Sequence, residues 1–358
     1  MKHWRGYLVA AIVAACTWGL QQFSAAHSVL VDMVYPYVTR MVQTYLAEAN
    51  GGVGFLIWRL LLFIGIAAAL ALIVVAVIRR WSIVRVVGWI LAAVSFVWLA
   101  SVGLYGLNNY AGPLADDIRL ENAEYAYSLD ELEKAAVFYR DQANALADKL
   151  TRDSKGNIEE QEFKKLAEDA ASGFDNLVQE RGYSVFAGST QPVKKLSLAG
   201  KRTTGKTVAL TGESAVNPSL PMTALPFAMS HEMCHRMCIA KDLDADFGAF
   251  LACTHSDSQL FQYSGYVNAY WACRQALEAV DSGALQTIEA GENANLKHDL
   301  NAHKKTFGKS GMADPQLCDL VTVWYVETQI LPLQEGEDER FDPLDESKVD
   351  LSGIVNAG

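Results

Sequence analysis

The residues best suited to chemistry form the stretch Ser230-His231-Glu232-Met233-Cys234-His235, an H-E-x-x-H motif. Histidines four positions apart project from one face of a helix, one turn apart, so their two imidazoles can hold one Zn²⁺. The intervening Glu232 is expected to be the general base that deprotonates a zinc-activated water and later protonates the leaving amine. The motif therefore predicts zinc-dependent hydrolysis, and the alternative is a surface helix with two solvated histidines.

A catalytic zinc centre also needs a third protein ligand and an open position for water. The segment 241–247 is a short turn leading into a second apolar helix, whose first turn would present a carboxylate back toward the histidines. We assign Asp244 as this third ligand. Asp246 is expected either to orient a ligand histidine or to cap the second helix. Cys238 is a rival ligand, because on a continuing helix it would share the face of the histidines.

These residues and several neighbouring motifs resemble the DUF3810 family of bacterial membrane proteins, which are predicted zinc metallopeptidases of the gluzincin kind. The resemblance includes the apolar segments, extends to about Leu277, and is carried by Thr211-Gly212-Glu213-Ser214-Ala215-Val216-Asn217, Leu225-Pro226-Phe227, the H-E-x-x-H motif, Asp244-Ala245-Asp246-Phe247 and Tyr263-Ser264-Gly265-Tyr266. It implies a polytopic membrane protein with a zinc-dependent peptidase domain that cleaves a peptide or protein substrate.

Two positions depart from the family pattern. The family has a glutamate ligand within Glu-Ala-Asn where this chain has Asp244-Ala245-Asp246, and aspartate is one methylene shorter. The family also has a glycine at the position of Cys238, which suits a helix ending in a left-handed residue. These departures support an alternative function, in which the domain is a catalytically silent extracytoplasmic binding or sensing module on a membrane anchor.

The elements that position the motif are expected to be mainly helical, with a small sheet beside the H-E-x-x-H helix. That helix should begin near 225–228, and 207–210 predicts a short strand. The resemblance implies that 208–216 provides a strand edge to which an extended substrate adds, and a purely structural strand is the alternative. The fold class is thus a set of N-terminal transmembrane helices followed by a mainly α (α+β) zincin-like metallopeptidase domain.

Other polar residues of this domain have weaker signals. Tyr263 and Tyr266 are candidate catalytic residues that could polarise the substrate carbonyl, as a Tyr or His does in many zinc peptidases, and His255 is a second candidate. His298 and His303 lie in a charged helix and are expected to face solvent. The Ser128-Leu129-Asp130-Glu131 sequence is a capping box that predicts the start of a helix.

Apolar residues are concentrated in the first part of the chain, which is 51% hydrophobic as a whole. We expect transmembrane helices at about 7–23, 54–78 and 86–107, because runs of this length cross about 30 Å of hydrocarbon. The first could instead be a cleaved signal peptide, but the family has three spans. The intervening region 29–46 has apolar residues at helical spacing around Pro36 and could lie in the membrane interface or pack on the spans.

The distribution of charge predicts the topology. Basic residues place one side of the spans in the cytoplasm, namely Lys2, Arg5, Arg79, Arg80 and Arg85. The C-terminal domain is therefore expected outside the cytoplasm of a multi-pass cell-membrane protein. The expected parts are a membrane domain at 1–107, an extracytoplasmic domain at 108–333 and an acidic flexible tail at 334–358. The net charge of −11 argues against nucleic acid as a partner.

Overall fold

The computed structural model describes residues 4–120, 126–197, 203–309 and 311–332, and the expected acidic tail lies outside them. The chain forms two compact units. Unit 1 comprises Met1–Gly112, Thr207–Ser214 and Arg236–Ala240, and unit 2 comprises Pro113–Lys206, Ala215–His235 and Lys241–Gly358. Two short segments from later in the chain therefore belong to unit 1.

Unit 1 contains three helices that are long and apolar enough to cross a membrane, namely α1 (Arg5–Ala26), α3 (Ile57–Ile78) and α4 (Ile83–Leu104). Each has 22 residues, and about 20 apolar residues suffice for the hydrocarbon core of a bilayer. They overlap the three expected spans. Helices α1 and α4 pack along each other within this unit.

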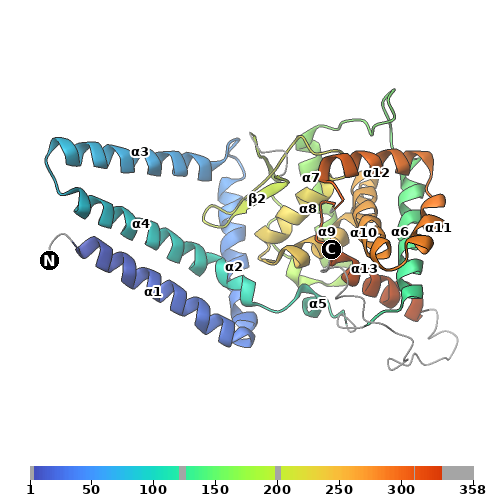
Figure 1. Ribbon diagram of the computed structural model, residues 1–358, viewed down its shortest axis with the longest axis horizontal. Coiled ribbons are helices and arrows are strands. Elements are labelled where there is room, and N and C mark those ends of the chain that lie inside the picture. The colour runs from blue at the N-terminus through green and yellow to red at the C-terminus, as the bar shows by residue number, and fades with distance from the viewer. Residues whose placement is uncertain (1–3, 121–125, 198–202, 310, 333–358) are drawn as a thin grey trace. The chain divides into compact units, whose positions relative to one another are not determined.

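A fourth long helix of unit 1, α2 (Ser28–Asn50), follows α1 after a single residue. Figure 1 shows it running across the ends of α1, α3 and α4 rather than alongside them. The Tyr35 hydroxyl donates to the Val102 carbonyl oxygen at 2.9 Å, next to the short 3₁₀ helix η1 (Gly106–Tyr110). Helix α2 is thereby joined to the end of α4, and its Arg40 and Gln43 side chains donate to backbone carbonyls in the two segments from later in the chain.

Unit 2 is mainly helical, and its central helix is α9 (Asp242–Thr254), which is buried along almost its whole length. The expected capping box is confirmed at the start of α6 (Leu129–Ala147), where the Glu131 amide donates to Ser128 Oγ at 3.2 Å and the Ser128 amide donates to Glu131 Oε2 at 2.7 Å. The remaining helices of this unit are α5 (Leu114–Asp117), α7 (Phe163–Arg181), α8 (Leu225–Arg236), α10 (Gln259–Val280), α11 (Ser282–Ala290), α12 (Ala294–Phe307) and α13 (Leu317–Tyr325).

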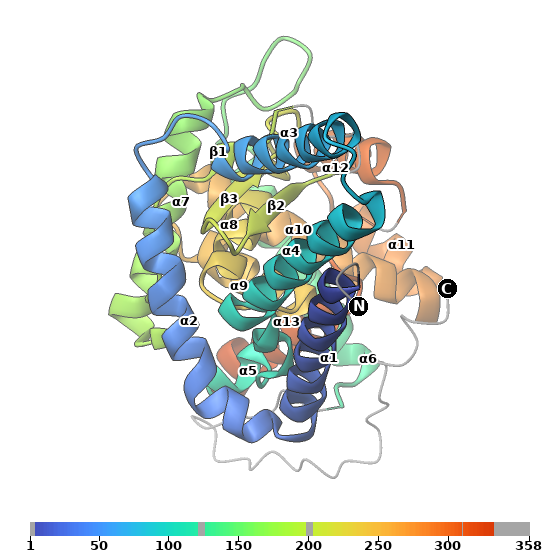
Figure 2. The ribbon, with the colours of Figure 1, turned by 90° about the vertical axis from the view of Figure 1, so that its left-hand side faces the viewer.

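A small mixed sheet accompanies these helices, in the order β1-β3-β2 (Figure 2). Strand β1 (Lys194–Lys195) runs parallel to β3 (Glu213–Val216). Strand β2 (Gly205–Val208) lies at the other edge and forms a hairpin with β3, because the Asn217 amide donates to the Thr204 carbonyl oxygen and the Thr207 and Ser214 hydroxyls meet at 2.8 Å. The sequence predicted one strand here, and the hairpin contains it.

His303 is buried, although the sequence predicted that it would face solvent. His298 is exposed, but His303 on the same helix is fully buried, with its ring between Trp271 and Phe307 at centroid distances of 4.9 and 4.7 Å. The expectation that His303 faces solvent is therefore wrong. Lys304 and Lys305 next to it are exposed, whereas the His303 ring lies on the buried side of α12, against Phe307 of the same helix and Trp271 of another.

Candidate metal centre

The two histidines of the motif are held one turn apart on α8. Their rings lie nearly perpendicular, with centroids 4.6 Å apart. The helix begins at Leu225, as predicted, and ends at Arg236. Cys238 then adopts a left-handed conformation with φ of 70°, and the chain enters α9 at Asp242. The left-handed turn that would suit a glycine is therefore made by a cysteine.

The reversal between the helices pairs both histidines with carboxylates of α9. Nδ1 of His231 lies 2.7 Å from Oδ1 of Asp246, and Nε2 of His235 lies 3.4 Å from Oδ1 of Asp242. Each helix contributes two residues one turn apart, and the chain direction reverses between them, so the first histidine meets the second aspartate. This crossed pairing is the central feature of the site.

The donor set fits a zinc ion. His231, His235 and Asp242 offer ligand atoms that all lie within 4.8 Å of one another. Zinc bonds of about 2.0–2.1 Å at tetrahedral angles separate two ligand atoms by about 3.3–3.4 Å, and the distance between His235 and Asp242 is 3.4 Å. Because Nδ1 of His231 is occupied by Asp246, its Nε2 is the atom left for a metal.

Asp246 is itself held from a second direction. Its Oδ2 accepts a hydrogen bond from the Asp314 amide at 2.7 Å, while Oδ1 faces His231. Asp246 is a buried residue, with 5% of its surface exposed. A metal-binding histidine commonly donates its other ring N–H to such a carboxylate, which fixes the tautomer and the ring orientation. Two roles were expected for Asp246, orienting a histidine or capping the second helix. Its contact with His231 corresponds to the first.

Asp244, which we expected to be the third ligand, is not a member of the cluster. It lies two positions after Asp242 and therefore points to a different side of α9. Its carboxylate is 3.9 Å from Lys241 Nζ and accepts a hydrogen bond from the Leu114 backbone. Burial raises its pKa, although Lys241 and the Leu114 amide act in the opposite direction. The structure thus brings Asp242, and not Asp244, to the imidazoles.

Charges around His231 favour its protonation in the absence of a metal. Burial disfavours the imidazolium form of His231, but the nearby Asp246, Glu232 and Asp242 carboxylates outweigh it and raise the pKa of His231 to about 9. The hydrogen bond with His235 lowers the pKa of Asp242. Metal binding requires a neutral imidazole, so a metal at His231 would displace a proton at neutral pH.

Glu232 lies between the two histidines in sequence and is buried, with 4% exposure. Strand β2 begins directly beside it, since a Cβ added at Gly205 would lie 2.4 Å from Glu232 Oε1 and 2.5 Å from its Cγ. Only glycine allows the strand to approach this closely. The edge strand of the sheet therefore starts at the carboxylate expected to act as general base.

The three residues considered as carbonyl-polarising groups have other contacts. The Tyr263 hydroxyl donates to Asp299 Oδ2 at 2.6 Å, and Asp299 also pairs with Arg152. Tyr266 packs against aromatic rings of α6, and Nδ1 of His255 lies 2.9 Å from the Leu251 carbonyl oxygen. None of these contacts joins the three residues to the imidazoles of His231 and His235.

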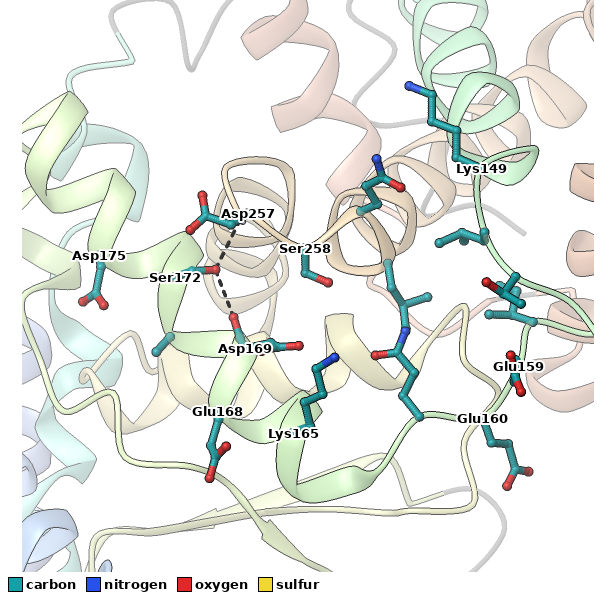
Figure 3. Close-up of a pocket in the computed structure, with 17 residues that line it drawn as sticks. Lys149, Glu159, Glu160, Lys165, Glu168, Asp169, Ser172, Asp175, Asp257 and Ser258 are labelled. Carbon is teal, nitrogen blue, oxygen red and sulfur yellow. Dashed lines mark hydrogen bonds between the residues drawn. The ribbon is translucent and has the colours of Figure 1, made fainter.

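A separate cavity of about 810 Å³ opens on α7 and the start of α10 (Figure 3). Ser172 Oγ lies at its wall, donating to the Asp169 carbonyl oxygen at 3.0 Å and accepting from the Asp257 amide at 3.3 Å. None of the expected site residues line this cavity. Its charged side chains are mostly acidic, namely Glu159, Glu160, Glu168, Asp169, Asp175 and Asp257, with Lys149 and Lys165.

Comparison with known proteins gives one result. A family model described as "Protein of unknown function (DUF3810)" matches residues 31–323, which include most of α2, all of α3 and α4, and nearly all of the described part of unit 2. No curated protein and no solved structure matches the chain.

Proposed function

The chain belongs to the DUF3810 family, and within it we propose that this protein is a membrane-anchored, zinc-dependent peptidase with a zincin-like domain. The observation that carries the proposal is the crossed pairing of two helices, in which Asp242 stands at His235 while Asp246 holds His231. Two imidazoles, one carboxylate and a fixed tautomer are what a catalytic zinc centre requires of a protein.

His231 and His235 would bind the ion through Nε2, and Asp242 would complete the set in place of Asp244. Three protein ligands leave the fourth position open, which distinguishes a catalytic from a structural zinc centre. When bound there, zinc would polarise the scissile carbonyl and lower the pKa of the attacking water.

Glu232 supplies the proton transfers in this proposal. Its carboxylate takes a proton from the attacking water and returns it to the leaving amine. Burial of Glu232 excludes bulk water from this transfer. The contact of its side chain with the backbone at Gly205 restricts where the carboxylate can lie, and restricted positioning of the base contributes to the rate.

Strand β2 is the proposed binding edge for the substrate in place of 208–216, because most of that segment is the turn of the hairpin and β3, the middle strand of the sheet. It is the last strand of the sheet on its side, and it begins at Glu232. An extended peptide that adds to such an edge would form main-chain hydrogen bonds along it, with its scissile bond near the base. The substrate is therefore a polypeptide in extended conformation.

The proposed location is the cell membrane, with α1, α3 and α4 as spans in contact with the lipid bilayer. The basic residues before α1 and between α3 and α4 would lie in the cytoplasm, in accordance with the positive-inside tendency. An odd number of spans then puts the C-terminal domain outside the cytoplasm.

The substitution Glu232→Gln tests the mechanism, measured with the full-length protein and an unstructured polypeptide as substrate. The expected result is loss of hydrolysis with zinc content unchanged, because an amide of the same shape cannot accept the proton. Hydrolysis at the wild-type rate would contradict the role of Glu232. A wild type that holds zinc yet cleaves no polypeptide would instead support a catalytically silent binding module.

A further inference from the structure

Helix α2 exposes a continuous apolar stripe on one side. Leu30, Val34, Met41 and Tyr45 are 55%, 55%, 71% and 74% exposed, and Tyr37 and Val38 lie between them on the same side. Spacings of three and four residues place all six on one face. An exposed helix in contact with water normally presents charged residues there, so this face is unusual for a water-facing surface.

Of the three charged residues of α2, Asp32 and Arg40 lie off this stripe, and Glu48 continues it beyond Tyr45 at the end of the helix. Asp32 accepts a hydrogen bond from the Gly112 amide at 2.9 Å, Arg40 is buried, and Glu48 lies in the last turn. The stripe also carries two tyrosines, Tyr37 and Tyr45. Tyrosine is enriched at the boundary between headgroups and hydrocarbon, where its ring is buried and its hydroxyl stays hydrated.

The ends of α2 are tied to two of the proposed spans. Only His27 separates α1 from α2, and six residues separate Asn50 from the start of α3. If α1 and α3 cross the bilayer in opposite directions, both ends of α2 lie at the same membrane surface. The helix is about 34 Å long at about 1.5 Å per residue, and in Figure 1 it crosses the ends of the spans. Its axis must therefore follow the membrane plane.

We propose that α2 is an interfacial helix that lies on the outer surface of the bilayer with its apolar stripe inserted at the level of the lipid headgroups. The partner is the lipid surface. Helices of this kind bury an apolar face about 5–10 Å into the boundary between headgroups and acyl chains. The inference rests on the proposed spans crossing the membrane, and it does not depend on zinc or catalysis.

The opposite face of α2 holds the two later segments of unit 1. Arg40 Nε donates to the Met237 carbonyl oxygen at 3.0 Å, and Met237 follows His235 by two residues. Gln43 Nε2 donates to the Ala209 carbonyl oxygen at 3.0 Å, directly after β2. Helix α2 therefore forms hydrogen bonds with the segment that follows the H-E-x-x-H helix and with the turn between β2 and β3. These bonds attach both segments to the helix proposed to lie on the membrane.

Site-directed fluorescence on the full-length protein tests the inference in vesicles of three parts phosphatidylcholine to one part phosphatidylglycerol. A Cys16→Ser background removes the one exposed cysteine, since the other five are buried. Val34→Cys and Met41→Cys carry the label on the stripe. Gly65→Cys, with nothing within 4 Å, reports a proposed span, and Lys164→Cys, with a side chain 78% exposed, reports a water-facing helix.

The expected result is that labels at 34 and 41 lose most of their fluorescence to a spin label carried near the lipid headgroup and little to aqueous iodide. The label at 164 should show the reverse. Quenching at 34 and 41 by iodide, as at 164, would overturn the inference, and so would protection from both quenchers, which would indicate a second protein copy on the stripe. Absence of lipid quenching at 65 would overturn the premise that α3 crosses the bilayer.

Discussion

Oδ1 of Asp242 lies 3.4 Å from Nε2 of His235, at the separation expected for two ligands of one tetrahedral zinc ion. The neighbouring Asp244 is turned toward Lys241 and the Leu114 backbone instead. Together with the contact between Asp246 and His231, this relationship assigns different tasks to three aspartates within five positions of one helix. The proposed peptidase mechanism depends on that assignment.

Asp246→Asn should weaken zinc binding by about 10–100-fold, the usual effect of altering a residue that orients a metal-binding histidine. The asparagine side chain lacks the negative charge of the carboxylate, which stabilises the N–H···O contact with His231 and the hydrogen bond from the Asp314 backbone amide. Competition with a chelator of known affinity measures the change. Asp175→Asn, at an exposed position of α7, is the matched control, and equal affinities for the two variants would contradict the role of Asp246.

Gly205→Ala should lower kcat/KM by about 100-fold, the order expected when a catalytic group is displaced by about 1 Å. The new methyl group would meet Glu232 Oε1 at 2.4 Å and push that side chain away. Zinc content should stay at the wild-type level because no ligand is touched. Gly52→Ala, where nothing lies within 4 Å, is the control. An unchanged rate in Gly205→Ala would show that β2 does not restrict the base.

Cys238→Gly should give a more stable protein than Cys238→Ala, by about 1 kcal/mol. Both variants remove the same buried thiol, but alanine keeps the Cβ that disfavours the left-handed conformation by about 1–2 kcal/mol. The residue has φ of 70°. The thermal unfolding midpoints of the two detergent-solubilised variants measure the difference. A higher midpoint for the alanine variant would mean that the turn after α8 is not left-handed.

His303 should make unit 2 sensitive to acid. Burial lowers the pKa of His303 to about 4 from 6.5, because the imidazolium has no water around it. The unfolded chain binds the proton more readily, so stability is full above about pH 6.5 and falls as the pH drops toward 4, by roughly 3 kcal/mol in all. Thermal unfolding of His303→Leu between pH 7 and 4 should show a smaller decline than wild type.

The control for this measurement is His298→Gln, an exposed position on the same helix. It should retain the wild-type decline with acid. If His303→Leu lost stability with falling pH as steeply as wild type does, the buried imidazole would not be a source of the acid sensitivity.

The elements were predictable from local patterns where one physical requirement determines them. The lengths of α1, α3 and α4 match the about 20 apolar residues that a bilayer-crossing helix needs, and the start of α6 follows from its capping box. The side of α12 that faces inward was not predictable, because it is chosen by contacts of His303 with Trp271 and Phe307. Periodicity identifies a face only when the apolar residues outnumber the charged ones on it.

The choice between Asp242 and Asp244 could not be made from the position of the first turn of α9 alone. Which carboxylate faces back depends on where the helix begins and on the left-handed residue at Cys238. A signal was nevertheless present in the sequence. The spacing of Asp242 and Asp246 equals that of His231 and His235, and two antiparallel helices can match such pairs, whereas Asp244 has no partner at that spacing.

Zinc content per chain, measured on the purified full-length protein with Asp242→Ala and Asp244→Ala beside wild type, tests the central claim most directly. The account predicts about one zinc ion in wild type and in Asp244→Ala, and little or none in Asp242→Ala, since a ligand is lost only in the last. Loss of zinc in Asp244→Ala together with full occupancy in Asp242→Ala would contradict it.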